Sequence, residues 1–247
     1  MIVNGLANSI PINNIATGGV SDAYGNLFAP TGVTFSIWGV IYLLLAAHTL
    51  FQFGLFQKDR GKSRNELFRN IGVYFVISSI ANILWIFSWH YYRISISLLL
   101  IVIILACLIK IADTIGKEQL LLKEKAFIGV PFSVYFGWIT VATIANVAAF
   151  LVSIGWDGFS IPDQIWTVLV VLIGAAIGIM RMFQDRTIPY GLVFIWAYVV
   201  IWIKHTSPGG FAGQYSAIIT TVIIAIILFI VAEAAVIYKR RNQNSSG

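Results

Sequence analysis

The sequence predicts an all-α protein, a polytopic transmembrane bundle of about seven helices. Of its 247 residues, 59% are apolar and only 11% are charged, with a mean hydropathy of +0.87, whereas a soluble domain carries about 25% charged residues. The apolar residues are grouped into runs long enough to cross a bilayer, which needs about 20 residues per helix. A soluble enzyme is therefore excluded. A nucleic-acid-binding protein is excluded too, because it needs clustered surface cations and not merely the net charge of +6.

Seven apolar runs separated by polar loops are the predicted spans. They are Thr34–Phe56, Ile71–Tyr91, Ile94–Ala112, Phe127–Ser153, Gln164–Met182, Ile188–Ile203 and Tyr215–Tyr238. Only Tyr92 and Arg93 separate the second run from the third, which predicts a tight hairpin, whereas a polar linker, Lys58–Arg69, precedes the second run. We expect three regions in the chain. They are an external N-terminal segment and loop (1–32), a four-helix region (33–153), and three additional helices with a basic cytoplasmic tail (154–247).

The basic residues lie mainly on one side of the predicted spans. Fourteen of the sixteen Lys and Arg residues fall in loops on that side, and only Arg93 and Lys204 fall on the other. The positive-inside rule then predicts a cell-membrane protein with its N-terminus outside and its C-terminus in the cytoplasm. The basic runs are topology signals first, and contact with lipid headgroups is an open alternative for them.

Aromatic and polar side chains recur at helical spacing in three of the predicted spans, so each set shares one helical face. The sets are Trp38 and Tyr42 in the first span, Asn82, Trp85 and Trp89 in the second, and Tyr135, Trp138 and Asn146 in the fourth. The two amides need partners in hydrocarbon, either across a helix contact or in a cavity. If the three faces converge, they form a pocket in the outer half of the bilayer for a flat, largely apolar ligand. The alternatives are interhelical packing and an interfacial aromatic belt.

The same residues resemble the TspO/MBR family, the tryptophan-rich sensory proteins that are also called peripheral benzodiazepine receptors. The resemblance rests on Tyr24-x-x-Leu27-x-x-Pro30 with Phe35-x-x-Trp38-x-x-Ile41-Tyr42, on Asn82-x-x-Trp85 with Trp89, and on Tyr135-x-x-Trp138 with Asn146. It covers about residues 20–153, in the order that the family has. It implies a tetrapyrrole such as a porphyrin or haem, a sterol or a related planar molecule as the ligand, with sensory, transport or porphyrin-breakdown roles.

The chain departs from the five-helix pattern of that family at both ends. The family's first helix should precede Pro30, where this chain has only the short helix-like stretch Ile2–Ile12, followed by a loop-like Asn13–Gly32. Three C-terminal spans are extra. The opening Asn4-Gly5-Leu6-Ala7-Asn8-Ser9-x-Pro11 resembles a larger branch of TspO-like membrane proteins. We hypothesise that the N-terminal stretch is the end of an eighth helix that starts upstream of Met1.

Two ionisable residues inside the spans are functional candidates, as such residues generally are. His48 in the first span and Glu233 in the seventh both fall in the predicted cytoplasmic half. One hypothesis is proton coupling between them, and the other is that Glu233 reaches the inner interface or pairs with basic residues. His90 and His205 are predicted at the outer surface, where they are either solvated or bind ligand carboxylates or a haem iron.

The sequence carries no zinc-protease motif, nucleophile elbow or phosphate-binding loop. We therefore predict a non-enzymatic binding or sensory protein without a metal, whose partners are the bilayer and a small hydrophobic ligand. A homodimer is left open. The alternative function is a proton-coupled secondary transporter of a small hydrophobic molecule, and porphyrin modification is a third hypothesis.

Overall fold

The computed structural model describes residues 12–53 and 62–245. Within these ranges the chain forms only helices and turns, which confirms the predicted all-α class. Among the described residues, seven helices are long and apolar enough to cross a membrane, which confirms the predicted number of spans. Apart from Ile12, the helix-like stretch Ile2–Ile12 lies outside the described residues.

The spanning helices lie close to their predicted positions. They are α3 (Ile37–Gln52), α4 (Lys62–His90), α5 (Ile94–Gly116), α7 (Val130–Ser153), α8 (Asp163–Asp185), α9 (Ile188–Thr206) and α10 (Ser216–Ser245). The polar linker predicted at Lys58–Arg69 is helical from Lys62 on, because α4 already begins there. The fifth and sixth spans are also longer than predicted. The apolar run shows only which residues of a helix lie in the hydrocarbon of the bilayer. Backbone hydrogen bonding continues each of these helices into the polar residues beyond that run.

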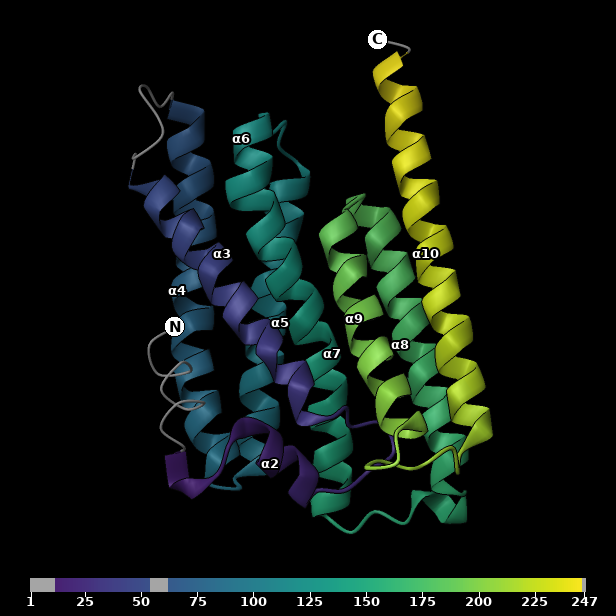
Figure 1. Cartoon of the computed structure of the whole chain (residues 1–247). Helices are drawn as coiled ribbons and strands as arrows, with labels where there is room; N and C mark the ends of the chain where they lie inside the picture. The colour runs from purple at the N-terminus through teal and green to yellow at the C-terminus, as the bar shows by residue number, and fades with distance from the viewer. Residues whose placement is uncertain (1–11, 54–61, 246–247) are drawn as a thin grey trace.

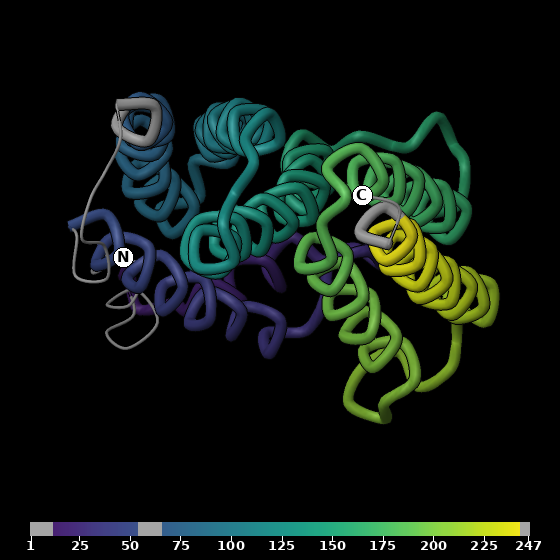
Figure 2. The backbone as a smooth tube through the Cα atoms, turned by 90° about the horizontal axis from the view of Figure 1, so that it is seen from above, coloured from purple at the N-terminus to yellow at the C-terminus, as the bar shows by residue number. Residues whose placement is uncertain are grey.

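The helices form two groups that meet at α7 (Figures 1 and 2). On one side α4 packs along α5, and both α5 and α3 pack against α7; on the other side α8, α9 and α10 pack together, with α9 against α7. Gly137 of α7 permits the close approach of α9, because a Cβ there would lie 3.0 Å from the Tyr190 carbonyl oxygen and 3.1 Å from Cβ of Val193. The Tyr190 hydroxyl donates to the Thr140 hydroxyl at 3.2 Å. Helix α7 therefore connects the predicted four-helix region to the three added helices.

The predicted external loop at residues 13–32 is partly helical. The short helices η1 (Ile12–Asn14), α2 (Thr17–Ala23) and η2 (Gly32–Ser36) lie across one end of the bundle, which we call the α2 end. The C-terminus, the turn from α8 to α9 and the short α6 (Leu122–Glu124) lie at the opposite end, which we call the α6 end (Figure 1).

A change of helix type precedes α7. Between α6 and α7 lies one π-helical turn, η3 (Lys125–Gly129), and Pro131 stands in the first turn of α7. Proline has no N–H and is tolerated in the first turn of a helix, where that donor is not needed. The α6–η3–α7 segment can therefore run as one span, Leu122–Ser153, despite the proline near its start.

Replacing Gly178 of α8 with alanine should destabilise the protein. A Cβ at Gly178 would lie 2.6 Å from Cζ of Phe229 and 3.0 Å from Cε1 of Phe194, and both rings are fully buried. Such overpacking costs about 1–3 kcal/mol. The matched control is Gly39→Ala on α3, where no atom lies within 4 Å, and alanine gains about 0.5–1 kcal/mol over glycine in a helix. Melting temperatures in one detergent compare the two variants, and equal values would contradict the close packing at Gly178.

Candidate functional site

Aromatic side chains from three helices meet near the α2 end. Trp38 of α3 is at their centre. Its ring centroid lies 5.5 Å from that of Tyr42, 6.0 Å from those of Trp85 and Tyr135, and 6.2 Å from that of Trp138. The structure thus brings together the aromatic faces predicted for the first, second and fourth spans.

A small cavity of about 30 Å³ lies among these rings, with room for about two water molecules. Its lining residues are Ser21, Pro30, Phe35, Trp38, Trp85, Trp89, Trp138, Val141, Ala142, Ala145 and Asn146. Five of the eight predicted site residues are in this lining, and Tyr42, Asn82 and Tyr135 are not. Tyr42 instead stacks on Trp38, and the Asn82 amide donates to the Tyr135 hydroxyl at 3.0 Å. These three side chains support the cavity wall.

Four buried polar atoms of the lining have no hydrogen-bond partner in the described part of the chain. They are the indole N–H groups of Trp38, Trp85 and Trp138 and the amide oxygen of Asn146. All four side chains are at most 3% exposed. The Asn146 amide nitrogen donates to the Ser97 hydroxyl at 2.9 Å, so Asn146 is both an interhelical contact and a wall residue. A buried polar group without a partner costs about 1–3 kcal/mol, and the cavity is therefore suited to a molecule with polar atoms of its own.

The N-terminal segment covers the cavity at the α2 end. Ser21 of α2, Pro30 and Phe35 of η2 line it, and Phe35 packs edge-on against Trp138 with 6.0 Å between centroids. None of these three residues was among the predicted site residues. Pro30 and Phe35 belong to the motif that carries the family resemblance, but nothing in the sequence marks Ser21.

Trp89 and His90, at the end of α4, hold the first part of this segment. The Trp89 indole donates to the Thr17 carbonyl oxygen at 3.0 Å. His90 Nε2 lies 3.1 Å from the Thr17 hydroxyl, and His90 Nδ1 lies 3.1 Å from the carbonyl oxygen of Ile12. The prediction that His90 lies at the surface is wrong, because its side chain is fully buried. Since both ring nitrogens are hydrogen-bonded, neither is free to bind a haem iron.

Lys204 and His205, at the end of α9, hold the second part. The Lys204 ammonium donates to the Ala29 carbonyl oxygen at 2.8 Å, and His205 Nε2 lies 2.9 Å from the Leu27 carbonyl oxygen. His205 is fully buried, so its predicted surface position is also wrong. The physical reason is the same for both histidines, because the N-terminal segment folds back across the helix ends and covers them.

His48 and Glu233 contact different helices. His48 Nδ1 lies 2.9 Å from the Phe127 carbonyl oxygen, and its ring packs edge-on against Phe132 at 4.8 Å. Glu233 of α10 faces α9 at Gly191, where a Cβ would overlap its carboxylate. Neither Glu233 oxygen has a hydrogen-bond partner in the described residues, so the predicted pairing with basic residues is not seen. No hydrogen bond joins His48 to Glu233 there, but Glu233 remains a buried, unpaired carboxyl group.

The seven spans and the enclosed aromatic cavity define a multi-pass helical membrane protein with an internal site. The family model described as TSPO-like protein matches residues 1–235 of the 247, and the chain belongs to this family. The match confirms the resemblance seen in residues 20–153 and extends it through α8, α9 and most of α10. No curated protein and no solved structure matches the chain.

The Trp89→Phe variant should loosen the N-terminal segment. Phenylalanine keeps a ring at this position but removes the donor to the Thr17 carbonyl oxygen, and a lost hydrogen bond of about 1 kcal/mol corresponds to about fivefold faster local opening. Hydrogen exchange of residues 17–23, followed by mass spectrometry, measures this change. The control is Trp202→Phe, because Trp202 is 38% exposed. Identical exchange in the two variants would contradict the anchoring role.

Proposed function

We propose that this chain is an integral membrane binding protein that takes a planar hydrophobic ligand, such as a tetrapyrrole, in the aromatic cavity. One observation carries the proposal, namely the set of unpaired buried polar atoms on Trp38, Trp85, Trp138 and Asn146. A cavity whose wall served only for packing would not need indole donors without acceptors. A ligand that supplies the acceptors accounts for them.

The wall offers two kinds of interaction to such a ligand. Indole rings bury a flat apolar surface by stacking, and their N–H groups donate to carboxylate or carbonyl oxygens. The Asn146 amide oxygen accepts a hydrogen bond, for which the pyrrole N–H groups of a porphyrin are suitable donors. Ligand sites of this type are mostly apolar, and a few polar atoms fix the orientation of the bound molecule.

A porphyrin is larger than the cavity of about 30 Å³, so binding requires the cover to move. The cover can be displaced more easily than a spanning helix, because Ser21 belongs to a helix of only seven residues. It is held by hydrogen bonds to Thr17, Leu27 and Ala29. The spanning helices can therefore stay in place while the segment opens. With the N-terminus outside, as the basic residues predict, the cavity opens toward the outer side of the membrane and is suited to sensing a ligand there.

Titration with protoporphyrin IX or haem tests this assignment. The Trp85→Phe/Trp138→Phe variant keeps the rings but loses two indole donors, so its Kd should rise on the order of tenfold. The shift of the porphyrin absorption band is the measurement, because it does not depend on tryptophan fluorescence. The control, Trp156→Phe/Trp202→Phe, removes two tryptophans that do not line the cavity and should change Kd less than about twofold.

A second variant fills the cavity and keeps every tryptophan. Ala145→Phe projects a ring into the lining and should abolish porphyrin binding, since the cavity has no room for both. Unchanged Kd values in Ala145→Phe and in Trp85→Phe/Trp138→Phe would show that porphyrin does not bind in this cavity.

A proton-coupled transporter is the second candidate function, and the unpaired carboxyl group of Glu233 favours it. Buried intramembrane carboxyl groups are typical of proton relays.

In proteoliposomes with an imposed pH gradient, Glu233→Gln should abolish the pH-dependent part of coproporphyrin uptake. It should not lower the melting temperature, because the amide replaces a group that is costly to bury when charged. Glu66→Gln is the control, since the Glu66 side chain is 68% exposed. Equal pH dependence in both variants would remove this candidate.

A further inference from the structure

A second and much larger cavity, of about 260 Å³, lies at the α6 end. Its walls come from α5, from the π-helical turn and the start of α7, from the turn between α8 and α9, and from α10. The added helices therefore complete it, and it shares no residue with the aromatic cavity. Its position is independent of the function proposed above.

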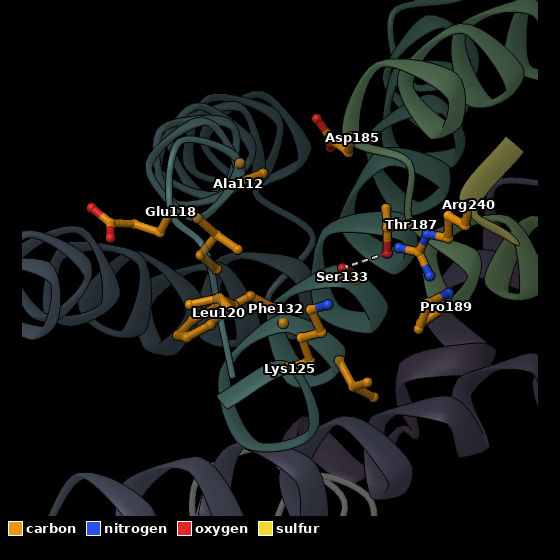
Figure 3. A pocket seen from close by; sticks show the side chains of 14 residues that line it. Ala112, Glu118, Leu120, Lys125, Phe132, Ser133, Asp185, Thr187, Pro189 and Arg240 are labelled. Atoms are coloured by element: carbon orange, nitrogen blue, oxygen red, sulfur yellow. Dashed lines mark hydrogen bonds between the residues drawn. The ribbon is translucent and has the colours of Figure 1, made fainter. Parts of the chain in front are cut away.

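Hydrogen-bond donors converge on one side of this cavity. Figure 3 shows the Lys125 ammonium and the Arg240 guanidinium directed toward the hydroxyl groups of Ser133 and Thr187. The Thr187 hydroxyl donates to the Ser133 oxygen at 2.9 Å, which leaves the Ser133 hydroxyl hydrogen free to donate. Arg240 uses one N–H on the carbonyl oxygen of Arg186, but a guanidinium group has five. Two cations and one hydroxyl can therefore donate to the same bound group.

The carboxylates of the lining are directed elsewhere. Asp185 accepts from the Arg181 guanidinium at 2.7 Å, and the same guanidinium bonds Asp113 at 2.6 Å. The Glu118 carboxylate points away from Lys125 and Arg240 in Figure 3. The negative charges therefore do not occupy the donors, and Lys125 has no ion-pair partner among the described residues.

Part of the cavity wall is apolar. Phe132, Leu120 and Ile115 contribute to it, so a ligand with an anionic head and an apolar part would find surface for both. This end of the bundle also carries most of the basic residues, which predict the cytoplasmic side. Basic pockets between transmembrane helices on that side are suited to anionic lipid headgroups.

We propose that the cavity at the α6 end binds a phosphate group, through Lys125, Arg240 and Ser133. A phosphate is suited to this arrangement because its oxygens can accept from several converging donors at once, and charge-assisted hydrogen bonds are the strong ones. The phosphate belongs either to the headgroup of an anionic phospholipid or to a free phosphorylated compound. The apolar wall is used fully only by the lipid.

The test is thermal unfolding of the purified full-length protein against increasing concentrations of two probes. Dioctanoyl phosphatidylglycerol carries the phosphate on a lipid, and glycerol 3-phosphate carries it without acyl chains. Dioctanoylglycerol, which has acyl chains but no phosphate, is the reference compound. A ligand that binds only the folded state stabilises it by RT ln(1 + [L]/Kd), so the melting temperature keeps rising with ligand concentration. The concentration that produces a given rise reports the affinity.

The Lys125→Gln/Arg240→Gln variant should need at least about tenfold more phosphatidylglycerol to reach the same rise in melting temperature. The control is Lys117→Gln/Lys123→Gln, which removes the same charge from exposed residues at the same end that do not line the cavity. It should change the required lipid concentration less than about twofold.

A response to glycerol 3-phosphate assigns the site to free phosphorylated compounds, and a response to the lipid alone assigns it to a headgroup. Equal shifts in the two variants, an equal effect of dioctanoylglycerol, or no stabilisation of the unsubstituted protein would overturn the proposal.

Discussion

Helices α7 and α9 come so close at Gly137 that a side chain there would meet the backbone of Tyr190. Most other features depend on this contact, because α7 contributes to both cavities. One end of α7 supplies Trp138 and Asn146 to the aromatic cavity, and the other supplies Ser133 to the cavity at the α6 end. Since Thr187 immediately precedes α9, the same helix contact also brings it to Ser133. A shift of α9 against α7 would therefore alter the second cavity directly. It would also move the cover of the aromatic cavity, because Lys204 and His205 of α9 hold Ala29 and Leu27.

Inside a bilayer no water is present to hydrogen-bond an unpaired polar group, so burying such a group costs several kcal/mol of free energy. Several long-range hydrogen bonds pair such groups. The side chains of Trp89, His90 and Lys204, for example, bond to backbone oxygens of the N-terminal segment. The indoles of Trp38, Trp85 and Trp138, near the same segment, differ from these side chains because they have no hydrogen-bond partner among the described residues. Their neighbours Tyr135 and Asn82 satisfy each other. The unpaired indoles of Trp38, Trp85 and Trp138 all line the cavity, whereas Trp89, which also lines it, donates to the cover.

The sequence was sufficient to predict the seven spans from the length of the apolar runs and the three aromatic faces from local periodicity, whereas it left the convergence of those faces open. Trp85 and Trp89 are four residues apart and share a helical face wherever the helix lies. The cover could not be predicted in this way. Ser21 reaches the cavity, and His90 becomes buried, because residues 12–36 cross the ends of α4 and α9. His205 is covered by the same segment together with Phe211 and Tyr215. The contacts of both histidines with this segment join residues more than seventy positions apart, and no local pattern encodes them.

The π-helical turn before α7 shows a further limit of periodicity. Each π-helical turn holds one residue more than an α-helical turn, so the residues before it are rotated by about 100° from the face that uniform α-helical spacing assigns. Lys125 is the first residue of that turn, and its face relative to Ser133 therefore cannot be read from a helical wheel. The same turn precedes Pro131, whose missing N–H removes one bond from the regular α-helical pattern. Pro131 and Lys125 thus belong to the same local departure from α-helical geometry. This departure directs the Lys125 ammonium toward the Ser133 hydroxyl in the second cavity.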